Sequence, residues 1–184
     1  VADTMPPLYY FLLHYWQILG SGIAWLRLLN IVVNTLTIII VFFLVREKFN
    51  KTAAFVAAIL LACCPFLIYH SQELRMYSLL LFGQVGFIYA VFHIIYNAET
   101  SPRAAGLQHS VVIKNKPSLL KWLDKNNQVS WYLLAIFFGV VAMYSHNLAF
   151  IGIIAINILF FDRNKHKFFL KIIGLQFFIF LCFS

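Results

Sequence analysis

Three ionisable side chains of different types, His70, Glu73 and Arg75, lie within six residues of one another between two long apolar stretches. A carboxylate or an imidazole can take a proton from an attacking group, and a guanidinium can bind a phosphate through two parallel hydrogen bonds. Charged groups near membrane-length segments are costly and usually face a cavity, a substrate or one another. The cluster therefore indicates a functional site, whereas the alternative is a short polar loop exposed to water. On a helix, Glu73 and Arg75 would diverge by about 200°, so they can serve one site only if residues 71–74 are not helical.

Two other segments could bring polar groups to the same place. Arg27 lies near the start of an apolar stretch, and Asn30 and Asn34 follow it three and seven residues later. We expect these three residues to share one inward-facing side of a helix, although Arg27 could instead extend its guanidinium outward to water. His146 interrupts a later apolar stretch.

The composition is that of a membrane protein. Of the 184 residues, 62% are hydrophobic and 11% are charged, and the mean hydropathy is +0.85. No soluble domain of this size can bury so many apolar side chains. The formal charge of +8 would suggest nucleic acid as a partner of a soluble protein, but here the basic residues lie between apolar stretches, so we expect no nucleic acid. Cys63, Cys64 and Cys182 lie inside apolar stretches without the spacing of a disulfide or a metal site.

The apolar stretches predict an all-α integral membrane protein, a multi-span helical bundle. A first helix, residues 7–19, would rise only about 20 Å against about 30 Å of hydrocarbon, so we expect it to lie in the membrane interface. Its apolar face would carry Leu8, Phe11, Leu12, Tyr15 and Leu19. We predict spans at residues 25–45, 53–69, 76–96, 131–144, 147–161 and 168–184. Pro65 can bend the second of these spans near its end.

The orientation of the bundle depends on residues 131–161, which are either one long tilted helix or two short helices that meet near His146. With two helices, one side of the membrane receives residues 46–51, 97–130 and 162–171, which hold 12 of the 14 Lys and Arg residues. The positive-inside rule makes that side cytoplasmic and favours two helices. The extracytoplasmic side then receives Asp3, Arg27, His70, Glu73, Arg75 and His146. We expect this side to be the active-site face.

Four motifs occur in an order that is typical of one enzyme family. They are Asp3-Thr4-Met5-Pro6-Pro7-Leu8-Tyr9-Tyr10, Leu26-Arg27-Leu28, the segment 69–77, and Tyr144-Ser145-His146-Asn147. In these motifs the chain resembles the integral-membrane C-class glycosyltransferases over nearly its whole length. The branch that it resembles most includes protein O-mannosyltransferases, aminoarabinose transferases of lipid A and rhizobial lipopolysaccharide transferases.

The resemblance implies transfer of a sugar from a polyprenyl or dolichyl phosphate carrier to a glycan, lipid or protein acceptor. We expect a multi-pass protein of the bacterial plasma (inner) membrane, with its active site facing the outside or the periplasm. Asp3 and Glu73 would be the catalytic acids. The residues expected to bind substrate are Arg27, His70, Gln72, Arg75, Tyr77, Tyr144 and His146.

The resemblance predicts no set of metal ligands in this chain. Many relatives have His before the proline pair where this chain has Met5, which puts in doubt a metal-binding or hydrogen-bonding role of that position. A divalent metal is the one cofactor that the resemblance leaves open.

The two ends of the sequence look cut. It opens in a polar loop without an initiating Met and stops inside an apolar stretch. We therefore interpret residues 1–184 as part of a single transmembrane glycosyltransferase domain that is truncated at both ends. Because the acid pair of the family's first external loop would precede Val1, the fragment alone is expected to be inactive.

Two other functions fit the same residues. A secondary transporter could use Arg27, Glu73 and Arg75 as substrate-binding or proton-relay groups, but transporters tend to show internal repeats and helices broken near the midplane, and no repeat is present. A structural membrane subunit could bind a partner through its polar loop. Such a subunit would not depend on a lipid phosphate.

Overall fold

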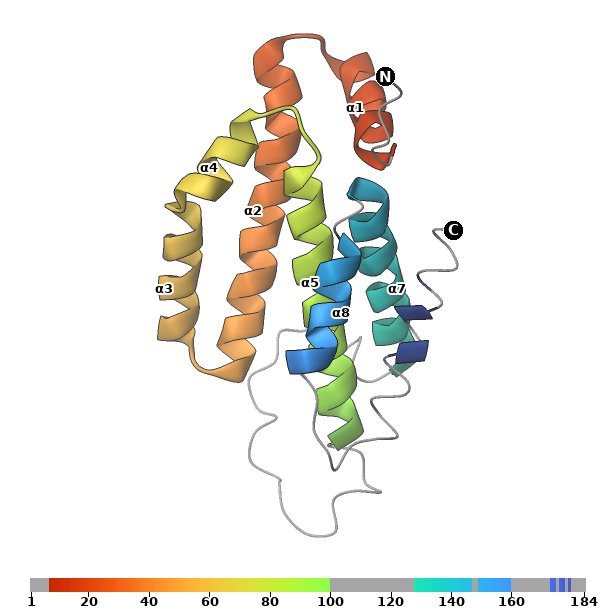
Figure 1. Ribbon diagram of the computed structural model, residues 1–184. Coiled ribbons are helices and arrows are strands. Elements are labelled where there is room, and N and C mark those ends of the chain that lie inside the picture. Colours follow the sequence, from red (N-terminus) through yellow and green to blue (C-terminus); the bar gives the residue numbers. More distant parts are fainter. Residues whose placement is uncertain are drawn as a thin grey trace.

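The regular structure of the chain is α-helical in every part that can be described, which confirms the predicted class. The computed structural model describes residues 7–99, 128–146, 149–159, 173–174, 176–177 and 179, and no strand occurs among them. Its helices are α1 (Leu8–Leu19), α2 (Ile23–Lys48), α3 (Lys51–Ala62), α4 (Pro65–Gln72), α5 (Tyr77–Glu99), α7 (Gln128–Ser145) and α8 (Ala149–Leu159) (Figure 1). Several predicted segments lie outside the described residues. They are Asp3, the whole of the stretch 162–171, the greater part of the stretch 97–130, and most of the last predicted span.

Two helices are long and apolar enough to cross a membrane. They are α2, with 26 residues and a mean hydropathy of 2.6, and the segment Tyr77–Tyr96 of α5, with a mean hydropathy of 1.9. A third crossing is added if α3 and α4 form one span. The chain is therefore an all-α membrane protein.

The predicted span 53–69 is divided into two helices by a sharp break. Helix α3 ends at Ala62, α4 begins at Pro65, and the two helices are bent by 51°. The residue before a proline is pushed out of the helical region, and Cys64 accordingly has an extended backbone, with φ −67° and ψ 119°. Pro65 itself fits the first position of a helix, where its missing N–H is not needed. The bend turns α4 across the upper part of α2 toward the start of α5 (Figure 1).

The apolar stretch 131–161 is likewise divided in the structure. Helix α7 ends at Ser145, and α8 begins at Ala149. His146 lies between them, and its main-chain carbonyl accepts a hydrogen bond of 2.9 Å from Ala149 N–H. The end of α7 lies beside the start of α5, where the rings of His146 and Tyr77 contact each other.

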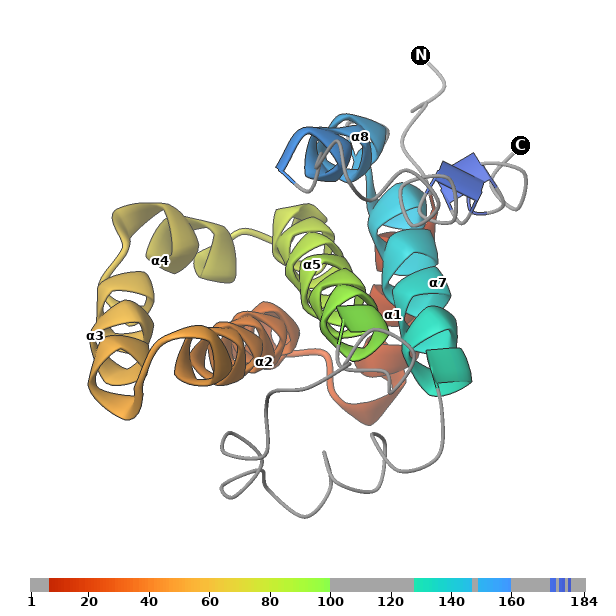
Figure 2. The same ribbon diagram turned by 90° about the horizontal axis from the view of Figure 1, so that it is seen from below.

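Helix α5 lies at the centre of the bundle, between α2 and α7, with α8 beside it (Figure 2). Its contact with α7 is close because Gly83 faces the α7 backbone, where a Cβ atom would lie 2.7 Å from Ala142 N. The core of this contact is made by apolar side chains of both helices, among them Phe87, Val91 and Trp131. A larger residue at position 83 would push the two helices apart.

Helix α1 packs on the bundle through a face that was not predicted. Tyr9 is buried, and Leu13 and Trp16 are half-buried at the spacing of one helical face. Four residues of the predicted apolar face are instead exposed: Phe11, Leu12, Tyr15 and Leu19. Both faces therefore have a use, since the Tyr9 face contacts protein and the exposed apolar face is open to lipid.

A buried polar cluster joins three helices at the end of the bundle where α2 ends. His93 Nε2 lies 2.9 Å from Glu47 Oε2, and the Tyr89 hydroxyl donates to Glu47 Oε1 at 3.4 Å. The His93 ring stacks on the Trp131 indole, with centroids 3.9 Å apart and planes within 6°. His93 is only 2% exposed because its face of α5 packs against α7.

Candidate functional site

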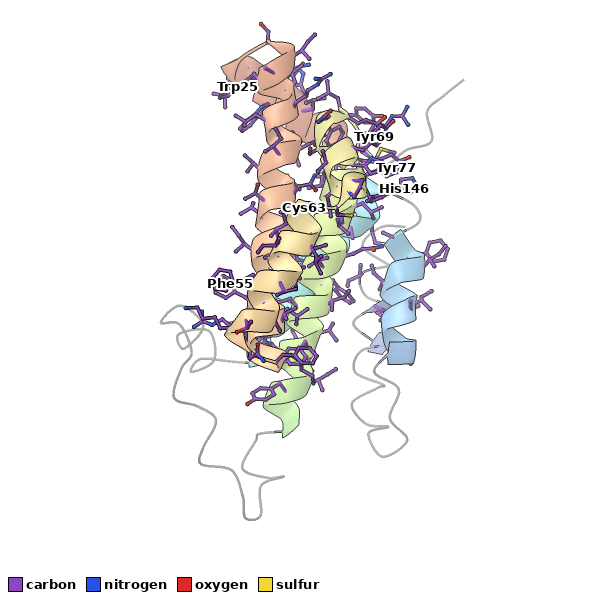
Figure 3. The ribbon with its side chains drawn as sticks, turned by 90° about the vertical axis from the view of Figure 1, so that its left-hand side faces the viewer. Trp25, Phe55, Cys63, Tyr69, Tyr77 and His146 are labelled. Carbon is purple, nitrogen blue, oxygen red and sulfur yellow. The ribbon has the colours of Figure 1, made fainter. Side chains whose placement is uncertain are left out.

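Four helix ends meet at the end of the bundle that is drawn uppermost in Figure 1, here called the upper end. Helices α2 and α5 begin there, and α4 and α7 end there. Figure 3 shows Tyr69, Tyr77 and His146, which belong to three different segments, close together at this end. The upper end therefore collects the polar residues that the sequence singles out.

Glu73 is the first residue after α4, and its backbone is extended, with φ −81° and ψ 138°. The predicted polar loop of residues 70–75 thus begins later than expected, since His70 and Gln72 still belong to the helix. Pro65 starts this helix, and the Glu73 N–H closes it with a hydrogen bond of 3.3 Å to the Tyr69 carbonyl. From Glu73 to Met76 the chain is a turn. The side chains of Glu73 and Arg75 are therefore not held about 200° apart, as they would be on a helix.

The Glu73 carboxylate is held by two side chains of α4. Its Oε1 accepts a hydrogen bond of 2.9 Å from the Tyr69 hydroxyl. Its Oε2 lies 3.4 Å from His70 Nδ1, which is ion-pair distance when the imidazole is protonated. The side chain is 25% exposed, so the carboxylate is fixed in place and still reachable from outside.

Aromatic rings line the site around His70. The centroid of the His70 ring lies 4.3 Å from that of Phe66, 5.2 Å from that of Tyr69 and 4.7 Å from that of Tyr77. Tyr77 in turn stacks on His146, with centroids 5.9 Å apart and planes at 28°. A continuous row of rings therefore runs from α4 through α5 to the end of α7. Flat π-faces of this kind suit the apolar faces of a sugar ring.

The two arginines predicted to bind substrate are both exposed. Arg75 is in the turn after Glu73, and Arg27 is in the first turns of α2. Neither guanidinium forms an ion pair with a carboxylate in the described residues, so both positive charges are available to an anion. Arg27 departs from the expected inward-facing side, because it is exposed whereas Asn30 and Asn34 are buried.

Asn30 and Asn34 are buried, as the predicted inward-facing side requires. Asn30 Nδ2 donates a hydrogen bond to the main-chain carbonyl of Glu73, and Asn34 Nδ2 donates to that of Leu67 at 3.3 Å. From the other side, the Ser78 hydroxyl donates to the carbonyl of His70 at 3.1 Å. Helix α4 and its terminal turn are thus tied to α2 and α5 through carbonyls.

Helix α1 is held against α2 by a reciprocal pair of tryptophans. Trp16 Nε1 donates to the Trp25 carbonyl at 2.9 Å, and Trp25 Nε1 donates to the Trp16 carbonyl at 3.2 Å. The two indoles stack, with centroids 5.1 Å apart. Gly20 makes room for this stack, because a Cβ atom there would lie 3.0 Å from the Trp25 ring.

Of the other predicted site residues, Gln72 is exposed at the end of α4 and Tyr144 is half-buried in the last turn of α7. Asp3 lies outside the described residues. The sequence did not single out Tyr9, Phe66 or Ser78. Phe66 could have been found from its helical spacing to His70, four residues later in the same helix. Ser78 could have been found as a polar residue at the start of an apolar span.

No group of three or more His, Cys, Asp or Glu side chains gathers within residues 7–99, 128–146 and 149–159. His70 and Glu73 therefore do not make a metal site by themselves. Their mutual contact instead suits proton transfer and its control.

A model of the family described as dolichyl-phosphate-mannose-protein mannosyltransferase matches residues 4–102 of the chain. The matched region contains α1 to α5, and with them Arg27 and the whole segment from Phe66 to Tyr77. No match was found among curated proteins, and none among solved structures.

Proposed function

Because the chain belongs to the dolichyl-phosphate-mannose-protein mannosyltransferase family of membrane glycosyltransferases, we propose that its upper end transfers a sugar from a polyprenyl or dolichyl phosphate to an extracytoplasmic acceptor. The observation that carries this proposal is the joint position of a held carboxylate, Glu73, and an exposed guanidinium, Arg75, in one short turn. The acceptor is a hydroxyl or amide of a glycan, lipid or protein.

In this proposal Glu73 acts as the general base. The acceptor oxygen or nitrogen forms a bond to the anomeric carbon, and its proton passes to the Glu73 carboxylate. The bond between that carbon and the carrier phosphate breaks, and its electron pair stays on the phosphate. His70 and Tyr69 keep the carboxylate in position through the contacts described above. Asp3 is proposed as a second acid at the same end.

Arg27 and Arg75 stabilise the leaving phosphate. Its negative charge grows as the bond to the sugar breaks, and two planar guanidiniums can each make paired hydrogen bonds to it. The rings of Tyr77 and His146 are proposed to support the sugar, with Gln72 and Tyr144 as polar contacts at its rim.

We propose that the upper end faces outward from a bacterial plasma membrane. The opposite end of α2 carries Arg46 and Lys48, and Lys51 begins α3 directly after it. The positive-inside rule expects the cytoplasm on that side. The basic residues of the stretches 97–130 and 162–171 support the same orientation.

Labelling of single cysteines tests this orientation. In a protein whose native cysteines are replaced by serine, S71C at the upper end should react with an impermeant thiol reagent added to intact cells. K51C, which is at the opposite end and exposed, should react only after the membrane is opened. Reaction of K51C in intact cells, without reaction of S71C, would reverse the proposed orientation.

The donor class is tested with the complete protein in liposomes. Dolichyl-phosphate mannose should be cleaved, or its mannose transferred, whereas GDP-mannose should not be used, because only the lipid carrier places its phosphate at the membrane surface. Uptake of a sugar into the liposomes without cleavage would instead indicate a transporter. Neither uptake nor cleavage, with any of several polyprenyl-phosphate sugars, would indicate a structural subunit.

A further inference from the structure

Asn30 lies where α1, α2 and the Glu73 turn meet. Its side chain is 1% exposed, and its Nδ2 donates to the main-chain carbonyl of Glu73. Tyr9 of α1 is equally buried, and its hydroxyl faces the Asn30 amide. Within the described structure, neither the Tyr9 hydroxyl nor Asn30 Oδ1 has a hydrogen-bond partner.

We infer that Asn30 is a positioning residue for Glu73. Asn30 fixes the position of the Glu73 turn, and its own position depends on how Tyr9 packs α1 against α2. The inference rests on the role proposed above for Glu73. It adds that α1 and the catalytic turn are mechanically coupled through one buried amide.

The Glu73 carbonyl needs such a partner because the helix ends one residue earlier. An unpaired carbonyl away from water costs roughly 1–3 kcal/mol, so the turn adopts the position in which the Asn30 amide can reach it. Once this carbonyl is fixed, the backbone from which the Glu73 side chain projects is fixed as well, and Tyr69 and His70 then hold the carboxylate. The carbonyls of Leu67 and His70 are tied by other residues, Asn34 and Ser78, whereas Asn30 acts on the carbonyl of Glu73 itself.

Tyr9 provides the second half of the coupling. Burial raises the pKa of its phenol, and the Asn30 amide beside it offsets only part of this rise. The phenol therefore stays neutral and keeps its proton as a donor. A bond from this hydroxyl to Asn30 Oδ1 would give both unpartnered atoms a partner, and the hydroxyl proton can rotate toward that oxygen.

Thr37 shows what a polar residue on the same face does without this role. It is buried like Asn30, and it lies seven residues further along α2. Its hydroxyl donates to the Val33 carbonyl of its own helix at 3.0 Å, so it ties α2 to nothing else. Thr37 is therefore a matched control for Asn30.

The test compares N30L, N30D and Y9F with T37V in the complete protein, using dolichyl-phosphate mannose as donor. N30L and N30D keep the size of the side chain but cannot donate as a neutral amide does. Misplacement of a catalytic group by about 1 Å can cost roughly 10²-fold in rate, so we expect kcat per folded molecule to fall by about that factor while KM for the donor stays within about threefold. T37V should stay within about twofold of the wild type.

Hydrogen exchange gives a second readout that does not need activity. Amides of residues 73–76 should exchange faster in N30L and in Y9F, but not in T37V. The double variant Y9F/N30L should be no worse than N30L alone, because both changes break one coupled network. If N30L does not fold, Y9F and N30D decide, since Y9F removes only the hydroxyl group and N30D exchanges only the amide nitrogen for an oxygen.

Unchanged kcat in N30D and Y9F, or equal exchange in these variants and T37V, would overturn the coupling. A wild-type protein that does not cleave the donor would instead overturn the proposed function. The exchange data would then still show whether Asn30 and Tyr9 fix the turn.

Discussion

Replacing Glu73 by Gln is expected to lower the rate of sugar transfer by roughly 10²–10⁴-fold, the usual contribution of a general base. Gln has nearly the same shape and can still accept the hydrogen bond of the Tyr69 hydroxyl, but it cannot take a proton. Binding of the lipid-phosphate donor should change little, because the phosphate is bound by other residues. Transfer rates and donor KM in liposomes measure the two effects separately.

Ser71→Ala is the matched control for this change. Ser71 lies two residues before Glu73. Its hydroxyl donates a hydrogen bond of 2.7 Å to the Ile68 carbonyl of its own helix. Its removal should leave the transfer rate within about twofold, as surface substitutions away from special features usually do. A Glu73→Gln protein with full activity would transfer the role of base to Asp3, and Asp3→Asn would then have to abolish transfer.

Arg27→Ala and Arg75→Ala are each expected to raise KM for the donor by about 10- to 100-fold. A hydrogen bond to a charged group contributes roughly 1.5–3 kcal/mol, which corresponds to that range. The proteins should remain folded, since both side chains are exposed and form no ion pair within the described residues. Arg→Lys should restore only part of the affinity, because a point charge cannot make the paired contact.

Arg46→Ala provides the control for both arginines. It removes the same side chain from the same helix, α2, but at the end opposite to Arg27. Donor KM should be unaffected by this change. Unaltered donor use in both Arg27→Ala and Arg75→Ala would remove the proposed phosphate contact, whereas a defect common to all three variants would point to the loss of general surface charge.

The helices could be predicted from the sequence because each depends on a local apolar stretch. The bend before Pro65 and the inward face of Asn30 and Asn34 follow from the same kind of information, since a proline acts on its neighbour and helical spacing places both asparagines on one side, although Arg27 was wrongly included in that face. The turn at Glu73 was harder to locate, because nothing local ends α4 at Gln72 rather than two residues earlier.

The positions that were missed depend on partners far away in the sequence. His93 reads as an isolated polar residue near the end of a span until Glu47 and Trp131 are known to lie against it. Tyr9 has the same difficulty, because its partner Asn30 belongs to another helix. In both cases the useful signal is that two neighbouring helices each carry a polar residue at the same depth. A single sequence shows this signal only after it is known which helices are neighbours.

The tryptophan pair has a consequence for the order in which the upper end assembles. Trp16 and Trp25 are only nine residues apart, whereas Asn30 and Glu73 are separated by 43 residues. Closing a short loop costs less entropy than closing a long one, so the α1–α2 hairpin can form while the later helices are still being synthesised. Tyr9 is then already seated beside Asn30 when the turn after α4 arrives. The first two helices thus serve as a template on which the turn at Glu73 docks, and substitutions at Trp16 or Trp25 should slow the assembly of the upper end more than they alter its final geometry.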